Sequence, residues 1–472
     1  MAAVSDSQAL FAALREVADA DIAAAIEHVV ASGTDRELAR INVLAFAAAR
    51  RLGEEPTIAA FLHAARLGIF EMAWDVLCPT CGGVLDAAMT LKDVHQAPYE
   101  CALCSRSFEL SLDEMVEVVF TVSARARKIA AHDPDTLPFW DYYRQVYWSS
   151  AVDLSDEGLK KLIAEFTLDA RVLDPGEQAS VAMQVPEGWV IVYEPVSHFG
   201  HYLKVAAERA ANVQHLSLAL TGARAPTATT TLQSGPLQLT IANRTGARAL
   251  PVVWIENRDF DQLVGKRRPN LTAKRIFTNQ TFRELYGSDT LAIEQSLKIV
   301  SLTFLFTDLK GSTELYARLG DLAAYELVRR HFRLLNEIVA AEAGAVVKTI
   351  GDAVMATFPT PDRALAAALR MREAVRDVRS ATQGADLVLK IGIHAGPCLA
   401  VMLNDRLDYF GQTVNIAARV QGLALPHEIL LTKPVVDDPQ SAALLKTAGI
   451  APRLQSAALK GIAGEVAVYR IA

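Results

Sequence analysis

Apolar residues recur at helical spacing along the first part of the chain. Three stretches carry this pattern, residues 7–33, 35–53 and 57–77, and each predicts a helix, the first of which ends at Gly33. The charged residues between the apolar positions fit the solvated faces of such helices. The pattern therefore predicts a helical N-terminal region that spans residues 1–77.

Residues 160–257 instead follow the two-residue period of β-strands. Short alternating runs stand between turn signals in this region, among them ARVLDPGEQASVAMQV, GWVIVYEP, LQLTIANRTG and ALPVVWIEN. We expect a β-rich, sandwich-like module here, and we find no catalytic constellation in it.

Two less regular segments flank this module. Residues 78–159 combine a zinc-ribbon-like pattern of cysteines with a connector that holds two predicted strands, in FELSLDEMVEVVFTVS, and an aromatic run, LPFWDYYRQVYWSS. The aromatic run is typical of core or interdomain packing, and an aromatic ligand box is the alternative. Residues 258–297 are predicted to form a linker with helical character.

From residue 298 onward, segments with the helical period alternate with segments that have the two-residue period of strands. The predicted elements are a strand, a helix, a hairpin, a second helix and a strand pair, over residues 298–308, 309–344, 346–358, 361–380 and 387–402. The order β-α-β-β-α-β is the ferredoxin-like arrangement. The apolar side of the first helix is predicted to comprise Leu315, Leu319, Leu322, Tyr325, Val328, Phe332 and Leu335.

Composition makes the chain a multidomain α+β protein. Its 472 residues are too many for one core and suggest roughly two to four domains, and a content of 51% hydrophobic and 21% charged residues indicates a globular fold. The net charge of −7 argues against a large nucleic-acid-binding surface. The sequence shows no signal peptide and no apolar run long enough to span a bilayer, which predicts a soluble, cytoplasmic protein without a transmembrane segment.

Four of the five cysteines are closely paired. Cys78 and Cys81 form one C-x2-C pair, and Cys101 and Cys104 form a second after 19 intervening residues. This spacing predicts one structural Zn²⁺ held by four thiolates, because each pair can turn two sulfurs toward one ion. The glycines after Cys81 permit the tight turn. Four buried free cysteines are the alternative.

Two aspartates stand at neighbouring strand ends of the predicted C-terminal domain. Asp308 ends the first strand, and Asp352 lies at the hairpin tip, where Gly351 supplies the turn. Carboxylates in this arrangement suit a divalent cation such as Mg²⁺, which binds one or two carboxylates together with substrate phosphates. Taken singly, Asp308 is explained as a helix-capping residue and Asp352 as a turn former, but their joint placement favours metal.

Further candidate site residues follow Asp308 directly or stand later in the chain. Leu309, Gly311 and Ser312 come after Asp308 at a predicted helix start, whose backbone N–H groups can hold phosphate oxygens. Asn415 and Arg419 stand four residues apart in an otherwise apolar helix, so both project from one face. Plain surface exposure is the alternative for these two side chains.

Several ordered motifs resemble those of class III nucleotidyl cyclases. FTDLKGST, VKTIGDAVMATF, IGIHAGPC and DYFGQTVNIAAR stand in the order of that family within residues 298–472. The resemblance implies an enzyme that converts ATP to cyclic AMP, or GTP to cyclic GMP. Residues 1 to about 200 more weakly resemble an uncharacterised domain found ahead of such cyclases. That second resemblance implies regulation, but it names no ligand or partner.

The cyclase resemblance also implies roles for matching residues. Asp308 and Asp352 match the aspartates that bind two Mg²⁺ or Mn²⁺ ions in each active site, and Lys348 and Asp408 match the pair that reads the adenine edge. In this family one chain supplies the aspartates and its partner supplies the other residues.

Further matches concern the ribose and the phosphates. Asn415 matches the residue that orients the ribose, Arg419 matches the one that stabilises the transition state, and Lys460 matches a lysine that contacts the triphosphate. Leu403 stands where the family often has an arginine, and Arg406 is the nearer candidate for a phosphate contact. Because the chain has both the two aspartates and the residues that a partner chain supplies in this family, two identical copies are enough to form complete active sites.

The chemistry of the base favours ATP. Adenine offers an acceptor at N1 and a donor at N6, which Lys348 and Asp408 complement, whereas guanine reverses this pattern and would suit a glutamate at position 348. We therefore expect an adenylate cyclase. The alternatives are a guanylate cyclase and a non-catalytic nucleotide-binding signalling module, and the second would require loss of a metal ligand or of Arg419, which are all present. A diguanylate cyclase would carry an acidic turn where IGDAV stands.

Overall fold

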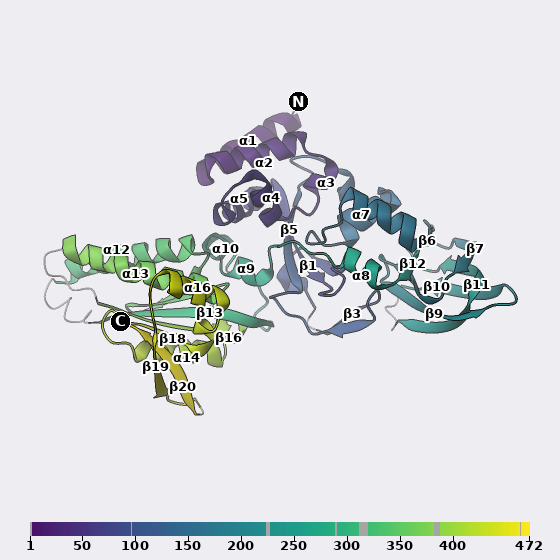
Figure 1. Ribbon diagram of the computed structural model, residues 1–472. Coiled ribbons are helices and arrows are strands. Elements are labelled where there is room, and N and C mark those ends of the chain that lie inside the picture. The colour runs from purple at the N-terminus through teal and green to yellow at the C-terminus, as the bar shows by residue number, and fades with distance from the viewer. Residues whose placement is uncertain are drawn as a thin grey trace. The chain divides into compact units, whose positions relative to one another are not determined.

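The computed structural model describes residues 2–95, 97–222, 227–287, 290–310, 320–381, 388–462 and 464–472. These residues belong to two compact units, drawn in Figure 1. The N-terminal unit comprises residues 1–110 and 114–271, and the C-terminal unit comprises residues 111–113 and 272–472. The finer domain boundaries that the sequence suggests within residues 1–297 remain predictions.

The N-terminal unit begins with helices, as the apolar periodicity predicts, although the helix predicted over residues 35–53 is interrupted at residues 39–42. They are α1 (Ala2–Val17), α2 (Ala20–Ser32), α3 (Asp35–Leu38), α4 (Val43–Arg50) and α5 (Glu54–Leu67). The first predicted helix is divided in two, because the Asp19 carboxylate accepts hydrogen bonds from the backbone N–H groups of Asp21 and Ile22 and so starts a new helix. Helix α2 ends before Gly33, as expected.

The helix predicted over residues 57–77 is wrong in its second half. Gly68, with a φ of +84°, ends α5 in the left-handed conformation that glycine adopts at no cost. The following residues form strand β1 (Phe70–Leu77), which pairs with β2 (Val84–Ala88) and β5 (Val116–Val122). A short apolar run fits a buried strand as well as a helix, and sheet partners decide between them.

A second sheet makes the rest of the N-terminal unit β-rich. It contains β6 (Thr167–Ala170), β7 (Gln178–Val185), β8 (Gly188–Glu194), β9 (Phe199–Arg209), β10 (Gln214–Leu220), β11 (Ala228–Asn243) and β12 (Val252–Glu256). The strands are connected through β11, and side chains from both halves, such as Val192 of β8 and Leu239 of β11, share one hydrophobic core. The first half of β11 pairs with β9 and the second half with β10 and β7, with a register shift at Ser234 and a φ of +117° at Gly235 between them.

The aromatic run at residues 137–150 packs into the core of this unit. It forms α6 (Phe139–Tyr142) and a π-helical turn (Tyr143–Tyr147). Tyr143, Tyr147 and Trp148 are buried, and Trp148 stacks against Trp254 with 6.2 Å between ring centroids. Further elements of the unit include the hairpin β3 (Tyr99–Cys101) and β4 (Arg106–Phe108) and the helices α7 (Asp156–Lys161) and α8 (Arg258–Val264).

The C-terminal unit is a mixed sheet covered by helices. After α9 (Ala273–Phe277) and α10 (Gln280–Tyr286), its elements are β13 (Ser296–Lys310), α12 (Asp321–Ala341), β14 (Ala345–Ile350), β15 (Ala353–Phe358), α13 (Pro361–Ala381), β16 (Val388–Leu403), β17 (Arg406–Phe410), α14 (Gln412–Gly422), β18 (Ile429–Thr432), α15 (Lys433–Val436), α16 (Pro439–Thr447), β19 (Arg453–Ala458) and β20 (Glu465–Ile471). The strands follow the order β14-β15-β13-β16-β18-β20-β19, and β17 pairs with β16.

The two faces of this sheet carry different helices. Leu305 and Ile393 point into the core beneath α12 and α13, together with Leu335 and Met371 of those helices. Helix α14 packs on the other face, where Val420 meets Leu430 of β18. Because side chains alternate along a strand, Asp308 lies on the α14 side of β13, three residues after Leu305.

Two expectations for this unit need correction. Residues 309–310 continue β13 instead of starting a helix. The strand pair predicted over residues 387–402 is wrong, because Val388–Leu403 form one long strand in which Gly396 and Pro397 lie where the pairing with β13 shifts register between Ile299 and Leu302. A bulge there takes the place of a turn.

The predicted apolar side of α12 is also partly wrong. Val328 and Leu335 are buried and Phe332 packs against the core, but Leu322 is 80% exposed and Tyr325 is 55% exposed. At about 100° per residue, Leu322 projects almost opposite to the buried side of the helix. Leu315 and Leu319 lie outside the described residues.

No helix in the described part of the chain combines the length and the apolar character that crossing a membrane requires.

Candidate active site and cysteine cluster

Asp308 and Asp352 are brought together by the hairpin β14–β15. Thr307 of β13 pairs with Val354 of β15, so the end of β13 lies beside the hairpin tip. Gly351 turns the chain there with a φ of +64°. Burial raises the pKa of the Asp308 carboxyl, and the neighbouring Asp352 carboxylate raises this pKa further. Two half-buried carboxylates therefore meet at one edge of the sheet.

Basic and polar groups partly offset this negative charge. Lys390 pairs with Asp308 across β13 and β16, so both side chains leave the same face, and the lysine lowers the pKa of the carboxyl. Gln421 of α14 also lies beside Asp308 and lowers that pKa. No local pattern in the sequence singles out either residue, because both are distant from Asp308 along the chain.

His331 is a third residue near the site that the sequence motifs did not identify. It lies on α12 and is 3% exposed, and neither ring nitrogen has a hydrogen-bond partner among the residues that the structure describes. Burial lowers the pKa of its imidazole to about 4, although the nearby Asp352 carboxylate acts in the opposite direction. The sequence does hold a signal, since Ala324, Val328, His331 and Leu335 follow helical spacing on the buried side of α12.

Lys348 and Asp408 form an ion pair. A bulge in β14 between Val346 and Lys348 displaces the lysine relative to β15, and its ammonium donates to the Asp408 carboxylate of β17. The aspartate side chain is 9% exposed and the lysine side chain 41%. The backbone N–H of Tyr409 also donates to Asp408, over 2.8 Å. The structure thus joins two candidate residues that are 60 positions apart.

Arg406 and Leu403 occupy the hairpin that leads to Asp408. They are paired across β16 and β17, and both are exposed. Arg406 stands two residues before Asp408 in the same strand, so the two side chains share one face of the hairpin. Leu309 is buried in the core, where it pairs with Leu389. Gly311 and Ser312 lie outside the described residues.

Asn415 and Arg419 project from α14. Asn415 is exposed, whereas Arg419 is half-buried and its Nη1 is a buried donor without a hydrogen-bond partner. The Arg419 guanidinium lies against Gly461, where a methyl group in place of the glycine hydrogen would stand 3.4 Å from Nη2. Exposed Lys460 directly precedes this glycine, so the loop before β20 brings Lys460 and Arg419 into one neighbourhood.

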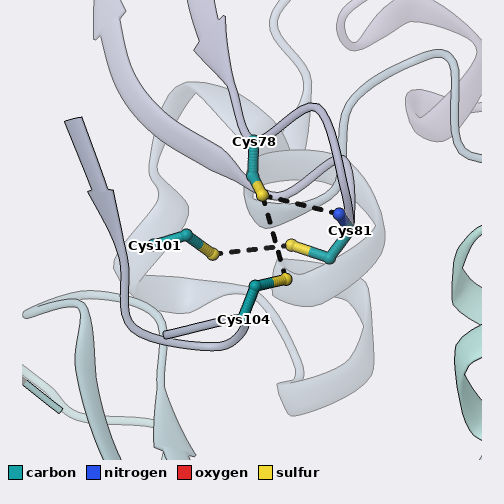
Figure 2. Close-up of side chains that lie close together, drawn as sticks. All are labelled: Cys78, Cys81, Cys101 and Cys104. Carbon is teal, nitrogen blue, oxygen red and sulfur yellow. Dashed lines mark hydrogen bonds between the residues drawn. The ribbon is translucent and has the colours of Figure 1, made fainter. Parts of the chain in front are cut away.

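The cysteine cluster lies in the N-terminal unit. Figure 2 shows the four thiols of Cys78, Cys81, Cys101 and Cys104 turned toward a common centre. The Sγ atoms of Cys78 and Cys104 are 3.9 Å apart, and those of Cys81 and Cys101 are 3.7 Å apart. A tetrahedral Zn²⁺ with Zn–S bonds of about 2.3 Å would separate its sulfurs by about 3.8 Å. The cluster is thus compatible with a zinc site.

The surroundings of the cluster explain its shape. Gly82 has a φ of +69°, as expected for the tight turn after Cys81, and its N–H donates to the Cys78 carbonyl over 2.8 Å. The side chain of Arg267 covers this turn and donates to the Thr80 carbonyl over 2.9 Å. A hydrogen bond to the Cys101 thiol raises the pKa of Cys104, because thiols this close cannot all ionise without a cation.

Comparison with known families assigns both parts of the chain. The sequence family described as "Family of unknown function (DUF5939)" matches residues 4–284, and the chain belongs to this family. The family described as "Adenylate and Guanylate cyclase catalytic domain" matches residues 294–469. The resemblance to class III nucleotide cyclases is thereby confirmed, and the C-terminal unit is a domain of that kind.

Individual relatives are similar to a third of the chain or less. The chain is 32% identical to "Adenylate cyclase" of Mycosarcoma maydis over 180 residues, which cover 33% of this chain and 7% of that protein. It is 33% identical to "Adenylate cyclase 2" of Rhizobium meliloti over 144 residues, covering 27% and 39%. It is 30% identical to "Guanylate cyclase soluble subunit beta-2" of Homo sapiens over 142 residues, covering 28% and 23%. The match spans well under half of each relative.

Solved structures match a similar share of the chain. The adenylyl cyclase CyaB from P. aeruginosa is 25% identical with a TM-score of 0.34, and the match covers 38% of this chain and 96% of that one. The guanylate cyclase domain of RhGC from Catenaria anguillulae, in complex with GTP, is 21% identical with a TM-score of 0.32, covering 37% and 97%.

Proposed function

We propose that this protein is an adenylate cyclase, which converts ATP to 3′,5′-cyclic AMP and pyrophosphate. The observation that carries the proposal is the placement of the Asp352 carboxylate beside Asp308 in a cyclase domain. Support for the fold comes from the strand order β14-β15-β13-β16 with α12 and α13 on one face, which we assign to a ferredoxin-like core.

Asp308 and Asp352 would hold two Mg²⁺ or Mn²⁺ ions. The two carboxylates fit such ions, because they lie close together and repel each other, and a divalent cation bound between their oxygens would relieve this repulsion. When bound, the ions supply Lewis-acid activation of the ribose 3′-hydroxyl and neutralise charge on the phosphates. The two carboxylates themselves fix the position at which the α-phosphorus is attacked.

Other residues of the chain bind and orient the nucleotide. Asn415 positions the ribose, and the unpaired Nη1 of Arg419 is available to the charge that grows on the phosphoryl oxygens. Lys460, next to the glycine that packs on Arg419, meets the triphosphate. Arg406 offers a further phosphate contact at the hairpin. Leu309 is committed to the core and to its pairing with Leu389, so Gly311 and Ser312 are the remaining candidates from that segment for a phosphate contact.

Lys348 and Asp408 favour ATP over GTP. Their ion pair holds a donor and an acceptor next to each other, and adenine presents the complementary acceptor N1 and donor N6. A guanylate cyclase remains the second candidate, because relatives of both kinds match this domain. A non-catalytic nucleotide-binding module is disfavoured, since no aspartate and no Arg419 has been lost.

We further propose that each site is shared between two copies of the chain. One copy supplies Asp308 and Asp352, and the other supplies Lys348, Asp408, Asn415 and Arg419. Large apolar side chains at the hairpin β16–β17 give the second copy a surface to cover, since Phe410 is 71% exposed and Leu403 is 54% exposed.

The N-terminal unit adds one structural Zn²⁺ and, we propose, regulation. Cys78, Cys81, Cys101 and Cys104 would bind the ion in a closed shell. Turnover assays of the purified chain with ATP and with GTP, each with Mg²⁺ and with Mn²⁺, test the proposed reaction. Cyclic AMP formation from ATP, faster than cyclic GMP formation from GTP, is expected. Absence of both products would refute the proposed reaction.

A further inference from the structure

A large cavity opens in the N-terminal unit, and neither the four clustered cysteines nor any residue of the proposed active site lines it. Its volume is about 840 Å³, which is the size of a site for a small organic ligand. The walls come from helices α2 to α4, from the aromatic segment that ends at Ser150, and from the residues around Val152 and Arg268. All of these residues belong to one unit.

The lining of this cavity is strongly basic. Five arginines and two acidic residues contribute to it, which leaves an excess of three positive charges among the lining side chains: Arg36, Arg40, Arg50, Arg144 and Arg268 against Glu37 and Asp156. A protein with a net charge of −7 therefore concentrates positive charge in one hollow. Burial lowers the pKa of the Arg36 guanidinium, and the neighbouring charge of Arg144 lowers it further.

The carboxylates nearby do not neutralise these arginines one by one. Asp156 is shared, because it accepts from both Arg36, over 3.0 Å, and Arg144. Arg40 has a carboxylate of its own, since it donates to buried Asp75 over 2.5 Å. Counting Asp75 and Glu117, two buried residues that do not line the cavity but lie near Arg40, an excess of at least one positive charge remains.

Neither of the other two arginines has a carboxylate as a hydrogen-bond partner among the described residues, although the Glu37 carboxylate lies near enough to Arg50 to interact with its charge. Arg268 donates to the carbonyl oxygens of Ser150 and Val152, at 3.1 and 3.4 Å. Arg50 is stacked on a ring, with its guanidinium carbon 3.9 Å from the centroid of Phe46. These two guanidinium groups are therefore the ones most suited to an anion from outside.

Buried donors in the wall also lack acceptors. Trp148 lines the cavity and is 3% exposed, and its indole Nε1 has no hydrogen-bond partner in the described part of the chain. The Nε of Arg144 is likewise buried and unpaired. A buried donor without a partner costs free energy that a ligand oxygen would recover. Apolar walls from Ile41, Phe46 and Leu154 complete the cavity.

We propose that this cavity binds a small phosphorylated organic molecule. Guanidinium groups match phosphate oxygens in paired hydrogen bonds, and the excess of positive charge suits a ligand with two or more phosphate charges. The rings and aliphatic side chains of the wall suit an apolar or planar part of the same molecule. The proposal stands independently of the cyclase reaction, because the N-terminal unit supplies every residue of the site.

Tryptophan fluorescence of the full chain tests this site selectively. The five tryptophans, Trp74, Trp140, Trp148, Trp189 and Trp254, all lie in the N-terminal unit, so binding in the C-terminal unit has no tryptophan to report it. The probes are inorganic pyrophosphate, ADP and citrate, titrated with a chelator present and at constant ionic strength. Pyrophosphate and ADP are expected to change the emission saturably, ADP at the lower concentration, and both at lower concentrations than citrate.

Variants then locate the site. Arg50→Ala with Arg268→Ala should weaken pyrophosphate and ADP binding about tenfold or more, because each removes charge-assisted hydrogen bonds to the ligand. The matched control, Arg66→Ala, changes an exposed arginine of the same unit and should leave binding unchanged. Trp148→Phe should abolish the emission change while binding persists by calorimetry.

Three results would overturn the proposal. They are the absence of a saturable emission change with every probe, undiminished affinity of the double arginine variant by fluorescence, and tighter binding of citrate than of ADP by fluorescence. The last result would assign the cavity to polycarboxylates instead. Cyclase activity is not measured in any of these experiments, so failure of the proposed reaction and failure of this site remain distinguishable.

Discussion

Arg419 and Gln421 lie two residues apart on α14 and point in nearly opposite directions. Gln421 reaches the sheet, where it lies beside Asp308, and its backbone approaches Gly392 so closely that a methyl group there would stand 2.3 Å from the Gln421 nitrogen. A separation of two residues turns a helix by about 200°. The Arg419 guanidinium is therefore directed away from the aspartates of its own chain and toward Gly461.

This geometry predicts complementation between inactive chains. Asp308→Ala and Arg419→Ala homodimers should both be inactive, because each lacks an essential group in both shared sites. In a mixed dimer one site collects both defects and the other has none. Random pairing of equal amounts makes about half of the dimers mixed, so about a quarter of wild-type activity should return on co-expression.

The matched control combines two variants that each lose one of the two aspartates, which the same chain supplies to a site. Co-expressed Asp308→Ala and Asp352→Ala chains leave every site with one lost carboxylate, so no activity should return. If proven mixed dimers of Asp308→Ala and Arg419→Ala stay inactive, the assignment of Arg419 to the partner chain must be abandoned.

Metal binding should depend on the paired carboxylates in a way that does not require turnover. Mg²⁺ or Mn²⁺ should raise the melting temperature of the wild-type protein by relieving the repulsion between Asp308 and Asp352. Asp308→Asn should raise the metal-free melting temperature slightly, abolish the metal-dependent increase and abolish cyclic AMP formation. Asp405→Asn, in the hairpin turn where Asp405 has a φ of +56°, is the control and should behave as wild type. A full metal response in Asp308→Asn would contradict the site.

Base choice should follow Lys348 and Asp408. Lys348→Glu combined with Asp408→Cys should lower ATP turnover about a hundredfold or more, because the donor and the acceptor for adenine are both lost. The ratio of GTP to ATP turnover should rise. Lys433→Glu, at an exposed lysine of the same unit, serves as control. An unchanged preference for ATP in the double variant would show that other residues read the base.

One Zn²⁺ per chain should accompany the cysteine cluster. Metal analysis of protein purified without chelator should find it, and its removal should lower the melting temperature, because a structural zinc contributes folding energy directly. Cys101→Ser should lose the metal, whereas Cys398→Ser, at the fifth cysteine, should retain it. Protein that is free of zinc and has unchanged stability would exclude a structural zinc.

His331 should make stability fall in acid. Its folded pKa of about 4 lies below the ordinary value of 6.5, so the unfolded chain binds the proton more readily between these pH values. The stabilisation is present above pH 6.5 and is lost as the pH falls toward 4, by about 3 kcal/mol in total. Denaturation of His331→Phe between pH 7 and pH 5 should show a shallower loss than wild type. Exposed His28→Phe should not, and equal slopes in His331→Phe and wild type would speak against this role.

Local signals determined much of what the sequence predicted well. The C-x2-C pairs place two thiols within reach of one ion whatever surrounds them, and the Gly351–Asp352 turn closes a hairpin that carries Lys348 on one strand. Gly33 ends a helix for an equally local reason. These features involve residues a few positions apart, and their backbone conformations restrict them before any tertiary contact forms.

Tertiary structure alone decided the remaining features, because they depend on partners far away in the chain. The run after Gly68 became a strand since β5 was there to pair with it, and β11 joined two halves of one sheet through Gly235. His331 looked like any polar residue in an amphipathic helix until α12 packed it beside Asp352. The direction of Arg419 follows from which face of α14 lies on β16. Which face of a helix turns toward the core depends on the elements that pack against it, and a single sequence does not state which elements these will be.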